Sequence, residues 1–191
     1  MPFTERSEPT RAAILTAARR RFTNDGYERT TVRSVAADAG VDPSMVMRYF
    51  TNKDGLFAAA TATDLRLPDL GGIPIDAVPA LLARHFVNRW EGDLADEAIM
   101  VLLRSAVTNP AAAERLRDVF ARQVTTLVRT LTHGAADSET RAGLISTQLL
   151  GIALCRYILK LPPVVALSPA ALIDAVTPVL RHFLIEPTVT G

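Results

Sequence analysis

Residues 31–53, with the sequence TVRSVAADAGVDPSMVMRYFTNK, constrain the fold of this chain more than any other stretch. They predict two short helices joined by a tight turn at Gly40, because glycine tolerates the left-handed backbone that such turns need. Either Thr30 or Thr31 would cap the start of the first helix, and Asp42 would cap the second. The segment therefore predicts a helix-turn-helix.

The second predicted helix has an outward face suited to DNA. The two helices would pack through a small apolar core, made of Val35, Val41, Val46 and Phe50. The outward face would then carry Ser44, Met45, Arg48 and Tyr49. A short helix held crosswise on another helix can place such side chains in the major groove. An ordinary helical hairpin in a bundle is the alternative, but its solvated face would mix acidic and basic residues, so the residue types favour DNA binding.

The composition of the 191 residues bounds the class of protein. Hydrophobic residues make up 49% and charged residues 21%, which allows a substantial core and argues against intrinsic disorder. The net charge is only +1, so a DNA-binding surface has to be local rather than a property of the whole chain. Helical periodicity recurs nearly throughout and strand-type alternation does not stand out, which predicts an all-α fold of about nine helices.

Cysteine usage and hydropathy indicate the expected compartment. The single cysteine, Cys155, excludes an intrachain disulfide and fits a reducing, cytoplasmic setting. Because its helix is apolar, we expect a buried, inert thiol rather than a nucleophile. The N-terminus has no apolar core of signal-peptide type, and the longest uncharged run, residues 142–155, is too short to cross a bilayer. We therefore expect a soluble protein with no membrane partner.

The proline- and glycine-rich segment 68–74 is the clearest linker in the chain. We predict a flexible tail over residues 1–8, a domain containing the helix-turn-helix over 9–65, and a larger helical domain over 66–191. In the first domain, a helix over residues 10–24 would end at Gly26, and a fourth helix would begin after Thr51 or Asn52. In the second domain, five helices are expected over residues 75–91, 95–108, 110–132, 138–161 and 169–184.

A set of motifs stands in order across Thr10–Ala60. The set comprises Ala-Ala-Ile-Leu at residues 12–15 with Phe22, Gly26-Tyr27, Thr31-Val32-Arg33, Val35-Ala36 through Gly40-Val41, and Phe50-x-x-Lys53 before Leu56-Phe57. In order and spacing this block resembles the N-terminal DNA-binding domain of the tetracycline-repressor (TetR) family of bacterial transcription regulators. The remaining two thirds resemble the family in layout, with a long all-helical regulatory domain. The resemblance implies operator DNA as a partner and a small-molecule inducer.

The resemblance also implies which residues meet DNA. These are Thr31, Arg33, Pro43, Ser44, Met45, Met47, Arg48, Tyr49 and Lys53. Thr31, Arg33 and Lys53 would bind backbone phosphates, whereas the residues of the second helix would approach base edges or phosphates further along. Met47 stands where family members often have tyrosine, and Tyr49 where they often have histidine. Since Met47 cannot donate a hydrogen bond to phosphate, it would touch a thymine methyl or simply pack within the helix pair.

Members of the family are homodimers, and a palindromic operator mirrors that symmetry. The last two predicted helices are apolar on more than one face, so they predict a four-helix interface between two copies. Gly151 would allow close approach of helices there. The alternative is that both helices merely close the core of one subunit.

The middle helices are expected to frame a cavity for the inducer. The candidate lining residues are Phe86, Trp90, Met100, Leu103, Arg104, Val107, Leu116, Phe120 and Gln148. For each apolar member, plain core packing is the competing interpretation. Arg104 would bind an acidic or carbonyl group of the ligand, or else lie at the surface or in an ion pair.

Two further classes of protein compete with a regulator. An all-helical enzyme is one, but no catalytic residues can be named, and the three histidines lack metal-ligand spacing, so we expect neither metal nor cofactor. An adaptor that kept the fold without binding an operator is the other. Ligand-responsive repression is the function that the sequence favours.

Overall fold

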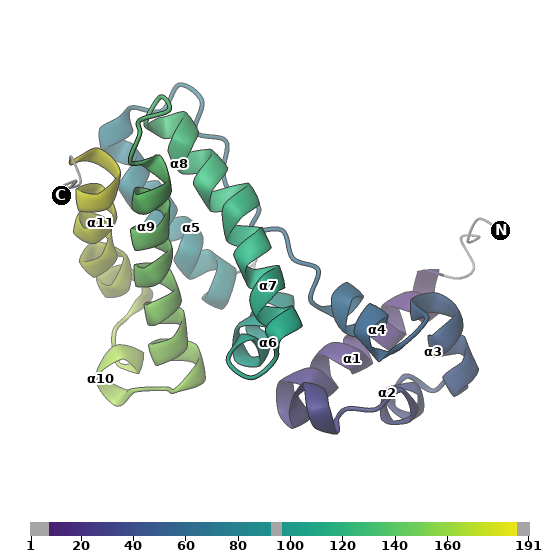
Figure 1. Cartoon of the computed structure of the whole chain (residues 1–191). Helices are drawn as coiled ribbons and strands as arrows, with labels where there is room; N and C mark the ends of the chain where they lie inside the picture. Colours follow the sequence, from purple (N-terminus) through teal and green to yellow (C-terminus); the bar gives the residue numbers. More distant parts are fainter. Residues whose placement is uncertain (1–7, 93–96, 187–191) are drawn as a thin grey trace. The chain divides into compact units, whose positions relative to one another are not determined.

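The computed structural model describes residues 8–92 and 97–186, and within these ranges all regular secondary structure is helical (Figure 1). This confirms the predicted all-α class. Residues 1–7 of the predicted tail and the first two residues of the helix predicted to begin at Ala95 lie outside the described ranges.

The N-terminal part contains α1 (Glu8–Arg29), α2 (Val32–Ala39), α3 (Pro43–Phe50) and α4 (Lys53–Ala60). The predicted end of the first helix is marked by Gly26, whose φ of 76° and ψ of 173° are not helical, and one further turn follows it. The Thr30 hydroxyl closes this turn by donating to the Gly26 carbonyl at 2.7 Å. α4 ends at Ala60, whose carbonyl accepts from Arg19 Nε at 3.0 Å.

Local side-chain caps define the helix-turn-helix. Thr31 and Ser34 cap α2 reciprocally, each hydroxyl accepting from the backbone N–H of the other residue, at 3.0 and 3.1 Å. Gly40 ends α2 with a φ of 66°, and the Asp42 carboxylate accepts from Ser44 N at 2.8 Å to begin α3. These contacts confirm Thr31, of the two candidate threonines, as the cap of α2, and Asp42 as the cap of α3.

The core of this region is apolar and aromatic. Its fully buried large side chains include Ile14, Phe22, Val35, Val46, Leu56 and Phe57. The rings of Phe22 and Phe57 meet edge-to-face with centroids 5.0 Å apart, and Tyr27 packs on Phe57 at 5.1 Å. α4 also approaches the end of α3 so closely at Gly55 that a Cβ atom there would collide with the Phe50 carbonyl oxygen.

The rest of the chain contains η2 (Ile75–Ala77), α5 (Val78–Glu91), α6 (Glu97–Ala106), α7 (Pro110–Val119), η3 (Phe120–Val124), α8 (Thr125–Leu131), α9 (Ser138–Ala153), η4 (Leu154–Ile158), α10 (Pro162–Val165) and α11 (Pro169–Ile185). The helix predicted over 110–132 is α7, η3 and α8 in succession, and the one over 138–161 is α9 and η4. Both η3 and η4 are π-helical turns, which sequence periodicity did not predict. The short α10 was not predicted either.

Two compact units make up the chain. Unit 1 comprises residues 1–63 and 97–116, and unit 2 comprises 64–96 and 117–191. α6 belongs with unit 1 because it packs on α1, where Arg104 Nη1 donates to the Thr23 carbonyl at 3.2 Å. The sequence analysis placed residues 66–191 in one domain. A contact between residues 81 positions apart, such as Arg104 and Thr23, could not be inferred from a linker pattern.

Unit 2 is built on α5, α9 and α11, which lie side by side (Figure 1). The buried Arg141 of α9 donates through Nη1 to the carbonyls of Leu184 and Glu186, at 3.2 and 2.7 Å, and so caps the end of α11. Its Nε lies 2.8 Å from the Asp137 carboxylate. None of the helices in the described residues is long and apolar enough to cross a membrane.

Candidate nucleic-acid interface

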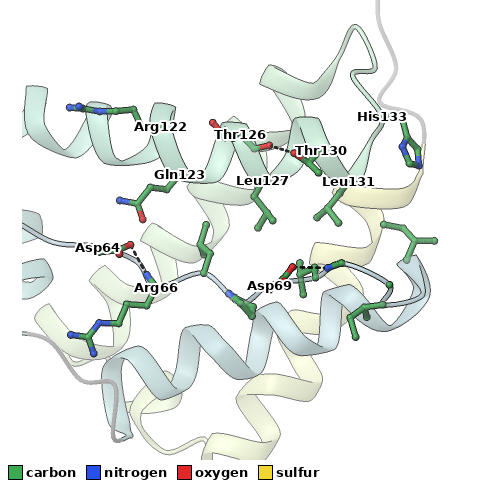
Figure 2. Close-up of a pocket in the computed structure, with 17 residues that line it drawn as sticks. Asp64, Arg66, Asp69, Arg122, Gln123, Thr126, Leu127, Thr130, Leu131 and His133 are labelled. Atoms are coloured by element: carbon green, nitrogen blue, oxygen red, sulfur yellow. Dashed lines mark hydrogen bonds between the residues drawn. The ribbon is translucent and has the colours of Figure 1, made fainter.

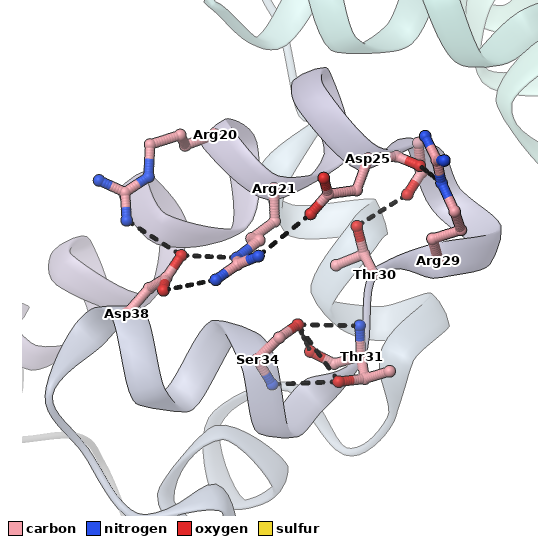
Figure 3. A network of polar contacts seen from close by, with 9 residues as sticks. Arg20, Arg21, Asp25, Arg29, Thr30, Thr31, Ser34 and Asp38 are labelled. Carbon is pink, nitrogen blue, oxygen red and sulfur yellow. Dashed lines mark hydrogen bonds and ion pairs between the residues drawn. The ribbon is translucent and has the colours of Figure 1, made fainter.

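An ion-pair cluster fixes α2 on α1, behind the residues predicted to meet DNA (Figure 3). Arg21 donates to both carboxylate oxygens of Asp38, at 2.7 and 2.8 Å, and Arg20 Nη2 lies 2.9 Å from the same group. Hydrogen bonds from Arg21, and then from Arg20, hold the pKa of the Asp38 carboxyl well below its usual range. Asp38 therefore stays ionised near neutral pH, and the bidentate geometry orients α2.

The structure brings the nine predicted DNA-binding residues together on the start of α2, on α3 and on the first residue of α4. Thr31, Arg33, Ser44, Met47 and Arg48 are exposed, and Pro43, Met45, Tyr49 and Lys53 are half-buried. None of the nine is fully buried, so each presents some surface to a partner. Met47 is 45% exposed, which argues against its being only packing material between the two helices.

Lys53 is held in place by the end of α1. Its Nζ lies 4.2 Å from the centre of the Tyr27 ring and donates to the Glu28 carbonyl at 3.2 Å. The Tyr27 hydroxyl donates to Asp54; burial, followed by this hydrogen bond, raises the pKa of Tyr27 to about 12. An ammonium group has three donors, so Lys53 can keep these contacts and still bind a phosphate. The sequence pattern had identified Lys53 but not Tyr27 as its support.

Asp42 places a negative charge beside the leading end of α3. Hydrogen bonds from the Ser44 side chain and backbone lower the pKa of the Asp42 carboxyl. The Ser44 hydroxyl is therefore oriented by Asp42 while its oxygen remains on the exposed surface. A hydroxyl fixed in this way can offer a lone pair to a base edge.

The nine residues predicted to line an inducer cavity divide between the two units. Met100, Leu103, Arg104, Val107 and Leu116 belong to unit 1, and Phe86, Trp90, Phe120 and Gln148 belong to unit 2. Leu103 and Phe86 are buried, whereas Val107 is 81% exposed. Arg104 is the α6 residue that donates to the Thr23 carbonyl, and Trp90 stacks on Tyr157 with ring centres 4.8 Å apart.

A pocket of about 800 Å³ lies within unit 2, between α8 and residues 64–75, which we call the strap (Figure 2). Its lining consists of Asp64, Arg66, Leu67, Pro68, Asp69, Leu70, Gly71, Gly72, Ile73, Ile75, Arg122, Gln123, Thr126, Leu127, Thr130, Leu131 and His133. None of the nine predicted lining residues is among them. The sequence had presented the strap only as a linker, because its apolar residues follow no helical or strand period.

Three hydrogen bonds hold the beginning of the strap. Leu65 N donates to Gln123 Oε1 of η3 at 2.8 Å, and His85 Nε2 lies 2.8 Å from the Leu65 carbonyl. The buried Arg89 donates through Nη2 to the Asp64 carbonyl at 3.1 Å. The strap therefore has a defined conformation although it lacks regular secondary structure.

The described residues contain no group of three or more His, Cys, Asp or Glu side chains that could hold a metal ion. Cys155 is half-buried, so the expectation of a buried thiol was wrong. The reason is that the middle of α9 and the η4 turn retain exposed surface in the single chain, which apolar sequence alone does not reveal.

Comparisons with known proteins agree with this geometry. A family profile described as "Bacterial regulatory proteins, tetR family" matches residues 14–60, and one described as "Tetracyclin repressor-like, C-terminal domain" matches residues 76–184. A search of the curated proteins finds no match.

Several solved structures are similar over nearly the whole chain. A TetR-family regulator from Streptomyces coelicolor A3 is 25% identical with a TM-score of 0.63, covering 97% of this chain and 100% of its own. NalD, the secondary repressor of the MexAB-OprM multidrug efflux pump in Pseudomonas aeruginosa, is 22% identical with a TM-score of 0.74, covering 96% and 99%. A putative transcriptional regulator from Saccharomonospora viridis, in complex with choline, is 18% identical with a TM-score of 0.68, covering 95% and 100%.

TetR-family proteins are transcriptional regulators and not enzymes, which removes the enzymatic alternative. They bind operator DNA, dimerise and bind small-molecule ligands. The second profile alone spans more than half of the sequence, and the helix-turn-helix lies inside the first. This chain therefore belongs to the tetracycline-repressor (TetR) family of bacterial transcriptional regulators.

Proposed function

We propose that the protein is a ligand-responsive repressor that binds a palindromic operator as a homodimer and is released by a small-molecule inducer. The observation that carries the proposal is the exposed face of α3, which is capped by Asp42, braced on α2, and flanked by phosphate-binding candidates on both sides. Because its proposed partner is operator DNA, we expect the protein in the bacterial cytoplasm.

The nine residues of the candidate interface would divide their work by position. Pro43, Ser44 and Met45 at the leading end of α3 would lie nearest to base edges, and Met47 would contact a thymine methyl. Arg48 and Tyr49 would reach phosphates or bases further along the groove. Thr31, Arg33 and Lys53 would fix the register of the protein on the DNA backbone, as phosphate contacts generally do. The exposed N–H groups at the start of α2 would add to the Thr31 contact.

Operator binding is tested with a duplex selected from a random pool. We expect Arg48→Ala and Lys53→Ala each to weaken binding about tenfold, and the Lys53 variant to lower the salt slope by about 0.9, the contribution of one phosphate. Arg84→Ala is the matched control, because Arg84 is an exposed arginine of α5 in the other unit. Unchanged affinity in both interface variants would overturn the assigned face. Failure to enrich any sequence would favour the adaptor alternative.

The proposed dimer forms through α9 and α11. Between the buried residues Ile145 and Ala153, every residue of α9 keeps exposed surface, although the segment includes Leu149, Leu150 and Ile152. Apolar side chains left half-exposed around a long helix indicate that a second copy covers them. The exposed Gly151 lies among them, and a Cβ atom there would meet nothing within 4 Å in its own subunit.

Light scattering tests this interface. We expect Gly151→Leu to shift the protein from dimer toward monomer, because the added side chain would separate the partner helices without disturbing its own subunit. Ala121→Leu adds similar apolar bulk at an exposed position of η3, outside both helices, and should leave the dimer intact. A Gly151→Leu dimer of unchanged stability would place the interface elsewhere.

Release by an inducer requires only that the ligand bind the DNA-free conformation better. A coupling of about 1–3 kcal/mol corresponds to about 5–150-fold in operator affinity. Repression is checked in a bacterial strain carrying a reporter under the selected operator, where removal of the protein should raise transcription. A fall in transcription would make the protein an activator instead.

A further inference from the structure

Gln123 joins the two segments through which the chain enters unit 2 from unit 1. The strap begins directly after Thr63, the last residue of the first stretch of unit 1. The helix formed by α7, η3 and α8 begins at Pro110 in unit 1 and continues into unit 2, since the backbone on both sides of η3 is helical. Gln123 Oε1 of η3 accepts the Leu65 N–H of the strap at 2.8 Å. This one bond therefore connects the strap to the helix that crosses between the units.

The strap depends on its first two residues for its polar attachment to the rest of unit 2. Besides Gln123, two side chains of α5 bind the carbonyl groups of Asp64 and Leu65, at 3.1 and 2.8 Å. Within the described part of the chain, residues 66–73 make no hydrogen bond to α5, η3 or α8. Beyond Leu65 the strap is held mainly by the burial of Leu70. The hydrogen bonds at its start therefore set its position.

The turn that carries Gln123 is π-helical. The Thr125 N–H donates to the Phe120 carbonyl, whereas in an α-helix it would donate to the Ala121 carbonyl. A π turn holds one extra residue, so the residues after it face about 100° away from where an uninterrupted α-helix would place them. Turns of this kind often occur at functional sites. The irregular turn thus determines the direction in which Gln123 faces relative to α7.

The same side chain borders the pocket beneath the strap. Gln123 is one of the lining residues, and Figure 2 shows its amide beside Asp64, where the strap begins. The strap forms one wall of this pocket of about 800 Å³, and η3 with α8 forms the other. A molecule in the pocket therefore lies between the two elements that the Leu65–Gln123 bond joins.

We propose that Gln123 is a positioning residue for operator binding, which acts through Leu65 and touches no DNA. With the bond formed, the strap and the helix that crosses between the units are held together within unit 2. With the bond broken, each moves separately, so more conformational freedom is lost when the dimer binds two half-sites at a fixed spacing. A ligand that draws Gln123 away from Leu65 would then lower operator affinity. This inference rests on the proposed ligand-responsive repressor.

The operator affinity of three full-length variants tests the proposal, with the duplex selected by the wild-type protein. Gln123→Leu removes the acceptor of Leu65 N, and we expect it to weaken operator binding at least about fivefold, the lower end of ordinary allosteric couplings. Gln123→Glu keeps an acceptor oxygen and should restore near wild-type affinity. Arg122→Gln is the matched control within η3, because Arg122 lines the same pocket but pairs with Asp118 rather than with the strap. Its operator affinity should equal that of the wild type.

The salt dependence of binding separates positioning from damage to the DNA face. Because Gln123 contacts no phosphate, the salt slope of Gln123→Leu should equal that of the wild type, and a lowered slope would overturn the proposal. Hydrogen exchange of the Leu65 amide on the same samples reports whether the bond is lost. Faster exchange with wild-type operator affinity would also overturn it, as would equal weakening by Gln123→Leu and Arg122→Gln.

The outcome for the wild-type protein keeps this inference apart from the proposed function. If the wild type selects an operator and Gln123→Leu binds it equally well, only the positioning role of Gln123 is refuted. If the wild type selects no operator, the proposed function is refuted, and the positioning role with it.

Discussion

The helix-turn-helix and unit 2 are both helical, but different contacts hold their helices in place. α2, α3 and α4 each begin directly after a capping residue, whose side chain accepts a backbone N–H two or three residues further along the chain. These capping residues are Thr31, Asp42 and Asn52. α5 and α9 have no side-chain cap at their first turn. In unit 2, Ser168 caps the start of α11, but the end of α11 is held by Arg141, which lies 45 residues from the Glu186 carbonyl that it binds. Arg156 binds a carbonyl of α10 that lies nine residues away. Local caps therefore begin α2, α3 and α4, whereas of α5, α9 and α11 only α11 has such a cap, and charged side chains from elsewhere in unit 2 add further contacts at the helix ends.

The strongest test of the DNA-binding side of this comparison is Gly55→Ala. A methyl group there would collide with the Phe50 carbonyl oxygen, which is backbone and cannot move aside cheaply. We expect a loss of more than about 3 kcal/mol in the stability of unit 1. Circular dichroism should show early unfolding, while fluorescence of Trp90, the single tryptophan, should report an unchanged unit 2.

Gly143→Ala is the matched control for Gly55→Ala. Gly143 is also helical, but a Cβ atom there would meet nothing within 4 Å. Its replacement should stabilise the protein by about 0.5–1 kcal/mol, since alanine loses less backbone entropy than glycine. Equal effects of the two substitutions would contradict the close approach of α4 to α3.

On the regulatory side, Arg141→Ala should cost about 2 kcal/mol or more. The change leaves Asp137 without its partner and the last carbonyls of α11 without a donor, in a buried setting. Denaturation followed by Trp90 fluorescence measures the loss. Arg129→Ala, at an exposed pair with Glu139, should cost about 0.5 kcal/mol or less. A similar cost at both sites would mean that long-range charged contacts do not hold unit 2.

The pH dependence of unit 1 should reveal the α1–α2 cluster. Because Asp38 has a folded-state pKa below that of the unfolded chain, its contribution is complete above about pH 4 and is lost as pH falls further. In denaturation curves, Asp38→Asn should flatten the fall in stability between about pH 4 and pH 3. Asp118→Asn, at an exposed pair between α7 and η3, should leave that fall unchanged. A wild-type slope retained in Asp38→Asn would exclude this cluster as its source.

The smallest expected effect concerns the strap. Gln123→Leu removes the acceptor of Leu65 N and should cost about 1 kcal/mol locally. Hydrogen exchange of the Leu65 amide should become faster, whereas Gln123→Glu keeps an acceptor oxygen and should preserve protection. If Leu65 exchanges equally fast in all three proteins, the bond does not hold the strap.

The two regions also differ in how well sequence reasoning predicted them. In the helix-turn-helix, cap residues, Gly40 and a period of apolar positions all lie within a few residues of the structure they specify, so the helices and their exposed face were predictable. The need for glycine at position 55 was not predictable. It depends on the Phe50 carbonyl oxygen that a Cβ atom would meet, and this contact is visible only in the structure.

In unit 2, the positions of the main helices followed from periodicity, but their interruptions did not. The π turns at η3 and η4 keep the same residues helical and change only the hydrogen-bond register. The strap formed a pocket wall because Gln123, His85 and Arg89 bind its backbone from a distance of 20 or more residues. The local sequence of residues 68–72 gives no indication of those partners.

The sequence by itself determined the helical class, the helix-turn-helix with its caps, and the family, since each depends on residues near one another in the chain. Only the tertiary structure decided that α6 packs with the DNA-binding helices, that Arg104 ties it to α1, and that the pocket lies under the strap. These features depend on contacts between residues far apart in sequence. Their free energy comes from burial and from hydrogen bonds that form only after the helices have packed.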